Sequence, residues 1–136
     1  MDSLYRADLL DHAAHPRHAA RIPPGEESSR LVNSACGDTV RWRLSFAPDG
    51  AIASAVHDTQ GCAICTAAAS LLAERVPGLS PADARALLAD LETRLRSATL
   101  PPEPPALAAL NALATRPARL PCALLPLQAL LLALPS

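Results

Sequence analysis

The chain has 136 residues, the size of one domain with a modest hydrophobic core, and we expect residues 1–136 to fold as a single domain. Its 12 basic and 13 acidic residues give a net charge of −1, which provides no positive field for a nucleic acid or an anionic membrane surface. All 12 basic residues are arginine, which excludes a lysine nucleophile, a lysine Schiff base and a P-loop phosphate clamp.

The beginning of the chain predicts a short helix followed by a loop. Residues 4–12 interleave leucines with aspartates, as amphipathic helices do, and the helix should end before Pro16 because the residue preceding a proline avoids the helical conformation. We expect residues 16–30 to form a loop. The first residues lack the charged, apolar and small-residue regions of a signal peptide, so we expect a cytoplasmic protein.

The next segment predicts an antiparallel hairpin. Residues 39–46 alternate apolar and polar side chains, the two-residue period of a strand with one buried face. The apolar positions are Val40, Trp42, Leu44 and Phe46. The turn residues 48–50, Pro-Asp-Gly, then lead into a second strand over residues 51–58.

The rest of the chain predicts helices. We expect one helix over residues 63–76 and another that begins after an N-cap at Ser80 and runs to about Arg96. Shorter helices are expected over residues 107–114 and 123–134. The last of these is the longest apolar stretch, and it falls short of the roughly 20 residues that a membrane span requires.

Four cysteines in a chain expected to be cytoplasmic indicate metal or redox chemistry rather than structural disulfides. They come from three separate regions of the sequence, each at the boundary of an expected element. The four are Cys36, Cys62, Cys65 and Cys122. Three readings are open on spacing alone: a shared metal site, inert buried thiols, and a redox pair formed by the C-x-x-C sequence of Cys62 and Cys65.

A tetrahedral zinc site needs four N, S or O ligands. We predict that Cys36, Cys62 and Cys122 supply three, and that Asp38 supplies the fourth because only Gly37 separates it from Cys36. Cys62 and Cys122 are expected at helix N-termini, where the helix dipole and free N–H groups favour thiolates. Cys65 is expected outside the ligand set, either as a buried thiol or as a residue that supports the site from behind the ligands.

Blocks of sequence in all parts of the chain resemble the SufU branch of the IscU/NifU-like iron–sulfur cluster assembly proteins. The matching blocks are Leu4-Tyr5-Arg6, Asp11-His12, Pro16-Arg17, Asn33-Ser34-Ala35-Cys36-Gly37-Asp38, Gly61-Cys62-Ala63-Ile64, and Pro117-Ala118-Arg119 to Cys122-Ala123. The 60-residue interval from Cys62 to Cys122 leaves room for the extra helical segment of the SufU branch. Pro121 stands where IscU-like members have a ligand histidine.

The resemblance implies an α+β fold in which a small antiparallel sheet of about three strands packs against about five to six helices. It also implies a zinc-dependent sulfur acceptor that takes persulfide sulfur onto Cys36 from a SufS-like, pyridoxal-phosphate-dependent cysteine desulfurase. The alternatives are a scaffold that assembles a transient [2Fe–2S] cluster on the same residues, with iron in place of zinc, and a structural zinc module without transfer activity. We expect a monomer or weak homo-oligomer.

Three positions near the predicted site stand apart from the pattern or lack an assigned role. Cys65 replaces the serine usual in the family, and Pro121 replaces a basic residue. Arg119 is a candidate supporting residue that orients a ligand or a partner carboxylate, against the alternative of a solvated arginine in a loop.

Overall fold

The computed structural model describes residues 2–135. The elements in this range are α1 (Asp2–Ala14), β1 (Ser29–Asn33), β2 (Asp38–Phe46), β3 (Ile52–Gln60), α2 (Ala63–Arg75), α3 (Pro81–Arg96), α4 (Pro105–Ala109), the 3-10 helix η1 (Leu110–Thr115) and α5 (Leu120–Ala133). The described residues thus form a three-stranded antiparallel sheet and five α-helices, which confirms the expected α+β fold.

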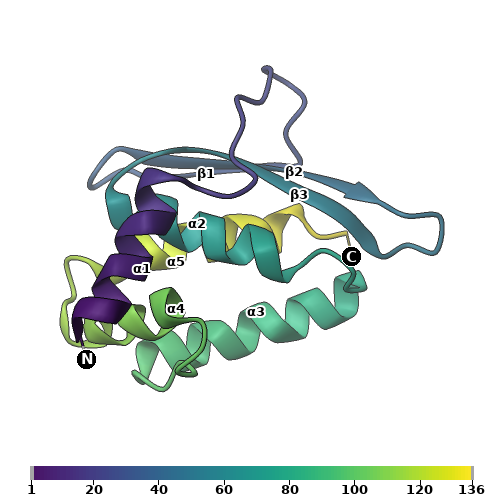
Figure 1. Cartoon of the computed structure of the whole chain (residues 1–136). Helices are drawn as coiled ribbons and strands as arrows, with labels where there is room; N and C mark the ends of the chain where they lie inside the picture. Colours follow the sequence, from purple (N-terminus) through teal and green to yellow (C-terminus); the bar gives the residue numbers. More distant parts are fainter. Residues whose placement is uncertain (1, 136) are drawn as a thin grey trace.

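The helices cover one face of the sheet, whose strand order is β1-β2-β3 (Figure 1). Helices α2 and α5 pack directly on the strands, and α3 lies on the far side of them, packed on α5 and η1. Helix α1 packs against α2 and α4 at one end. Within the described residues no helix is long and apolar enough to cross a membrane.

The central strand β2 carries the buried face that its alternating pattern predicts. Val40, Trp42 and Leu44 are buried, and the Trp42 indole donates a hydrogen bond of 3.0 Å to the Pro126 carbonyl of α5. Phe46, expected on the same face, is instead 42% exposed. The reason is a register shift between Ser45 and Phe46, where a β-bulge breaks the alternation.

Several expected boundaries were wrong. Residues 29–33 form the edge strand β1, where a loop was expected up to residue 30, because the adjacent apolar residues Leu31 and Val32 do not show the two-residue period of a strand. The predicted helix at 107–114 begins at Pro105 and tightens into η1. The last helix begins at Leu120, since Pro121 is tolerated in a first turn.

Buried polar contacts fix α1 against α2. Ser70 Oγ, on α2, lies 2.7 Å from His12 Nδ1 and accepts a hydrogen bond of 2.8 Å from the Arg17 backbone N–H. Both His12 and Ser70 are buried. One hydroxyl therefore holds both the end of α1 and the loop that follows it.

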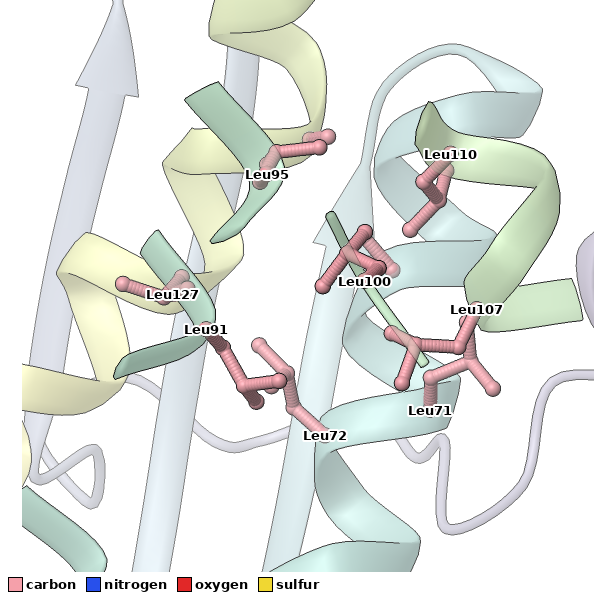
Figure 2. A pocket seen from close by; sticks show the side chains of 10 residues that line it. Leu71, Leu72, Leu91, Leu95, Leu100, Leu107, Leu110 and Leu127 are labelled. Atoms are coloured by element: carbon pink, nitrogen blue, oxygen red, sulfur yellow. The ribbon is translucent and has the colours of Figure 1, made fainter. Parts of the chain in front are cut away.

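The layer between α2 and α3 is made of leucines that surround a small apolar pocket (Figure 2). Its labelled side chains are Leu71, Leu72, Leu91, Leu95, Leu100, Leu107, Leu110 and Leu127. They come from α2, α3, α5, the loop after α3 and the α4–η1 segment. Leu91 and Leu95 of α3 thus line this pocket together with leucines of the other helices.

Candidate metal centre

A tight turn between β1 and β2 brings two chemically active side chains together. The Asn33 carbonyl accepts hydrogen bonds from the backbone N–H groups of Cys36 (3.3 Å) and Gly37 (2.7 Å). Gly37 has φ +77°, a left-handed conformation that glycine adopts at little cost. The turn places Cys36 just before Asp38, the first residue of β2.

The side chains of Cys36, Asp38 and Cys122 converge. Each offers one ligand atom within 4.8 Å of the ligand atoms of the other two. Asp38 is 7% exposed and Cys122 is 6% exposed, whereas Cys36 is exposed to solvent. The cluster therefore has two buried ligand groups and one that an approaching molecule can reach.

The chemistry of this cluster suits a cation. Asp38 Oδ2 is buried and has no hydrogen-bond partner among the described residues, a costly arrangement for a carboxylate unless a positive charge compensates it. Two thiols and a carboxylate are a ligand set that Zn²⁺ accepts, with one tetrahedral position left for a further ligand. The residues present thus fit a bound zinc ion.

The electrostatics of Cys122 differ from the expectation that a helix N-terminus makes it a thiolate. Burial, and then the neighbouring Cys62 thiol, raise the pKa of Cys122 to about 12. Cys122 is the third residue of α5, and desolvation at this position outweighs the helix dipole. A cation is what would favour its charged form.

Gly61 approaches the cluster closely, and the sequence analysis assigned it no role. A Cβ atom at this position would lie 2.9 Å from Asp38 Cγ and 3.1 Å from Asp38 Oδ1, closer than such atoms pack. Gly61 therefore provides the space that the Asp38 side chain occupies. In the sequence, Gly61 stands directly before the residue that becomes the N-cap of α2, within the block that resembles the family, and neither feature indicates a contact with Asp38.

Cys62, one of the three predicted thiolate ligands, is not a member of the cluster formed by Cys36, Asp38 and Cys122. It is the half-buried N-cap residue of α2, with an extended backbone (φ −71°, ψ 170°) and no capping hydrogen bond from its side chain. Its thiol neighbours Cys122 closely enough to raise the pKa of that residue. Its role as a ligand stays a prediction.

The two candidate supporting residues lie in contrasting places. Cys65 is fully buried in the core, where burial, and then the negative charge of Asp38, raise its pKa. Arg119 is exposed at the N-cap of α5, and its side chain has no ion pair or hydrogen bond within residues 2–135. The backbone of Arg119 does contact a cluster residue, because its carbonyl accepts a hydrogen bond of 3.0 Å from the Cys122 N–H.

A family model described as NifU-like N terminal domain matches residues 4–118. This match ends before Cys122, whereas the structural likenesses below extend across the chain. The interval between Cys62 and Cys122 contains α3, as expected from the resemblance to the SufU branch.

Known proteins that are similar in sequence to this chain have names that contain NifU or IscU. The NifU/MnmA bifunctional protein of Rubrobacter xylanophilus is 34% identical over 80 residues, which are 59% of this chain and 16% of that protein. The iron–sulfur cluster assembly scaffold protein IscU of Streptococcus pyogenes is 33% identical over 87 residues, 64% of this chain and 54% of that protein. The chain thus spans about half, or much less, of the length of these relatives.

Solved structures share the whole fold. The crystal structure of FiSufU from Fervidobacterium islandicum AW-1, a candidate cluster assembly scaffold for the SUF system, superposes with a TM-score of 0.79 at 21% identity and covers 98% of both chains. The crystal structure of a hypothetical protein superposes with a TM-score of 0.83 at 28% identity, with the same coverage. The arrangement of sheet and helices is therefore one already seen in crystals.

Proposed function

The chain belongs to the NifU-like N-terminal domain family, and from this premise we propose that it serves iron–sulfur cluster assembly as a zinc-dependent sulfur acceptor. Its partner would be a SufS-like, pyridoxal-phosphate-dependent cysteine desulfurase in the cytoplasm. The observation that carries the proposal is the solvent-exposed Cys36 next to a buried carboxylate oxygen of Asp38 that has no hydrogen-bond partner among residues 2–135. An accessible thiol beside a cation site is what sulfur transfer requires.

The proposed zinc ligands are Cys36, Asp38, Cys62 and Cys122. The cluster of Cys36, Asp38 and Cys122 supports three of them, and the position of Cys62 beside Cys122 supports the fourth. Bound zinc would supply the positive charge that keeps these cysteines as thiolates at neutral pH. Asp38 is the weaker ligand of the set, because a carboxylate oxygen binds zinc less tightly than a thiolate does.

Cys36 is the proposed nucleophile. Its Sγ is exposed and makes a long contact of 3.9 Å with the Asn33 carbonyl, so a partner's cysteine can reach it. The Cys36 thiolate attacks the outer sulfur of the desulfurase persulfide, a new S–S bond forms, and the desulfurase cysteine leaves as a thiolate. Sulfur is passed on without net oxidation or reduction.

The test is desulfurase turnover in the presence of this protein. Cys36→Ser should abolish the stimulation of cysteine consumption, whereas Ser34→Ala, an exposed neighbour in the same turn, should keep it. Mass spectrometry of the intact chain should show one added sulfur atom that Cys36→Ser lacks. Equal stimulation by the two variants would refute the assignment of Cys36.

A second function, a scaffold for a transient [2Fe–2S] cluster, is favoured by the name of the Streptococcus pyogenes relative. The three cysteines Cys36, Cys62 and Cys122 would then hold the cluster, and Asp38 would tune its release. Elemental analysis of the purified protein and anaerobic reconstitution with iron and sulfide separate the two functions. One equivalent of retained zinc supports the acceptor, and a stable visible absorption from a cluster supports the scaffold.

A further inference from the structure

One nucleophile near the site has no part in the proposed transfer. Cys65 is 0% exposed and is not a member of the cluster formed by Cys36, Asp38 and Cys122. It stands three residues after Cys62, at the third position of α2. The first turn of α2 therefore carries a second, buried thiol three residues after Cys62.

The geometry of these two positions suits a disulfide. Helix geometry places the Cα atoms of residues three apart about 5 Å from each other, and a disulfide spans Cα separations of roughly 4.4 to 6.8 Å. The first turn of α2 is formed, because the Thr66 N–H donates to the Cys62 carbonyl at 3.0 Å. The Cys62 side chain makes no capping bond to the backbone of α2, and its thiol lies beside both Cys122 and Cys65.

The two thiols also differ in access, as an attacking and a resolving thiol do. Cys62 is half-buried at the helix end, whereas Cys65 lies entirely within the core. Sulfur carried by Cys36 has a short path to Cys62, because Cys122 lies within 4.8 Å of Cys36 and directly neighbours Cys62. Cys65 is enclosed in the core beside these thiols, and its burial protects it from outside reagents.

We propose that Cys62 and Cys65 form a dithiol that reduces the accepted sulfur to sulfide. The outer sulfur first moves from Cys36 to Cys62, which forms a persulfide there and leaves Cys36 as a thiol. Cys65 then attacks the inner sulfur of the Cys62 persulfide, a Cys62–Cys65 disulfide forms, and the outer sulfur leaves as hydrogen sulfide. The two thiols lose two electrons and the sulfane sulfur gains two.

This activity rests on the proposed function and adds the step that sulfur transfer alone does not perform, which is the reduction of the sulfur to sulfide. A desulfurase delivers sulfur at the oxidation level of a persulfide, whereas a cluster contains sulfide, so two electrons must be added to each sulfur. The dithiol supplies them within the chain. The disulfide withdraws Cys62 from the metal centre and leaves Cys36, Asp38 and Cys122 in place.

The test uses one equivalent of glutathione persulfide with the protein as purified and no other reductant, so that no desulfurase is needed. Cleavage after arginine sorts the cysteines into three peptides: residues 31–41 hold Cys36, residues 44–75 hold Cys62 and Cys65, and residues 120–136 hold Cys122. A Cys62–Cys65 disulfide thus stays within one peptide, which loses the mass of two hydrogens. A disulfide between Cys36 and Cys122 joins two peptides.

The natural chain should release close to one sulfide per chain and show the disulfide within residues 44–75. Cys65→Ser and Cys65→Ala should release at least tenfold less and keep the added sulfur on Cys62. Alanine is common around this buried position, which makes the second variant a safeguard against misfolding. Sulfide release from both variants at the natural rate, or a disulfide that maps to Cys36 and Cys122, would overturn the proposal.

Because glutathione persulfide replaces the desulfurase as the sulfur donor, this experiment tests the dithiol separately from the proposed partnership with a desulfurase. If glutathione persulfide yields sulfide and the Cys62–Cys65 disulfide but no desulfurase is stimulated, the dithiol stands and the desulfurase partnership fails. If a desulfurase is stimulated but neither product forms from glutathione persulfide, the transfer stands and the dithiol is refuted.

Discussion

At the scale of single residues, the proposed metal centre depends on the burial of Asp38 and on the space around its side chain. One carboxylate oxygen is buried without a hydrogen-bond partner among residues 2–135, and Gly61 leaves just enough space for the side chain. Burial of an uncompensated carboxylate destabilises a fold, whereas the same carboxylate is favourable beside a cation. Asp38 should therefore have opposite effects on the metal-free and the metal-bound protein.

Asp38→Asn should stabilise the metal-free protein by about 1 to 3 kcal/mol, because burying a neutral amide costs less than burying an unpaired carboxylate. The same variant should weaken zinc binding at least about tenfold. Urea unfolding after chelation and competition with a chromophoric chelator measure the two effects. A metal-free variant with a lower free energy of unfolding than the natural chain would show that the Asp38 carboxylate does not destabilise the metal-free fold.

Gly61→Ala should weaken zinc binding by roughly 10- to 100-fold, the usual range for changes that misalign a metal ligand. The backbone of Gly61 is not in the left-handed region, so the effect should come from contact of the new Cβ with Asp38. A double-mutant cycle with Asp38→Ala provides the control. If Gly61→Ala costs the same affinity in the Asp38→Ala background, the loss has another origin.

At the scale of elements, the proposed ligands of the metal centre come from three places: the turn before β2, the N-cap of α2 and the first turn of α5. Each of these ends is fixed by packing of its own element on the others. β2 pairs with both neighbouring strands, and α2 and α5 pack on the sheet and on each other. Stability of the elements is therefore a condition for the geometry of the centre.

Ser80→Ala should destabilise the protein by about 1 kcal/mol, the usual cost of losing an N-cap side chain. Ser80 caps α3 by accepting a hydrogen bond of 3.1 Å from the Asp83 N–H. Equilibrium unfolding in urea gives the change in the free energy of unfolding. Ser80→Asp, which restores an acceptor, should recover most of the loss, and no recovery would mean that the cap is not its source.

How far the sequence predicted these elements depended on the strength of local signals. The limits of α3 followed from the cap at Ser80 and its proline, and the core of β2 from its two-residue period. The edge strand β1 has few apolar positions and gave no such signal. The closeness of Gly61 to Asp38 could not be foreseen, because it depends on how two distant segments pack.

At the scale of the whole molecule, two buried histidines join separate layers. His12 connects α1 to Ser70 of α2, and His57 of β3 lies 3.1 Å from the Arg17 carbonyl in the loop over the sheet. Burial is the main cause that lowers the pKa of each below 6.5, the usual value. Both side chains are thus held in their neutral form by the fold.

The free energy of unfolding should be constant between about pH 7.5 and 6.5 and should fall as the pH decreases below 6.5. The unfolded chain binds protons at these histidines below their usual pKa, whereas the folded chain resists protonation until its lower pKa values are reached. The slope should be at most about 1.4 kcal/mol per pH unit for each histidine. Urea unfolding between pH 7.5 and 5 measures it.

His12→Gln provides the matched variant for this prediction. Glutamine can still hydrogen-bond with Ser70 but does not titrate, so the slope below pH 6.5 should decrease even if the overall stability changes. A slope identical to that of the natural chain would assign the acid sensitivity to other groups.

The leucine-lined pocket between α2 and α3 gives the molecule a mechanical asymmetry (Figure 2). Hydrostatic pressure favours states that eliminate internal voids, so its effect on a protein is greatest where packing is incomplete. This void lies among the helices and is lined by no residue of the sheet. Compression should therefore loosen α3 from the helices beneath it while the strand and turn that carry Cys36 and Asp38 keep their shape.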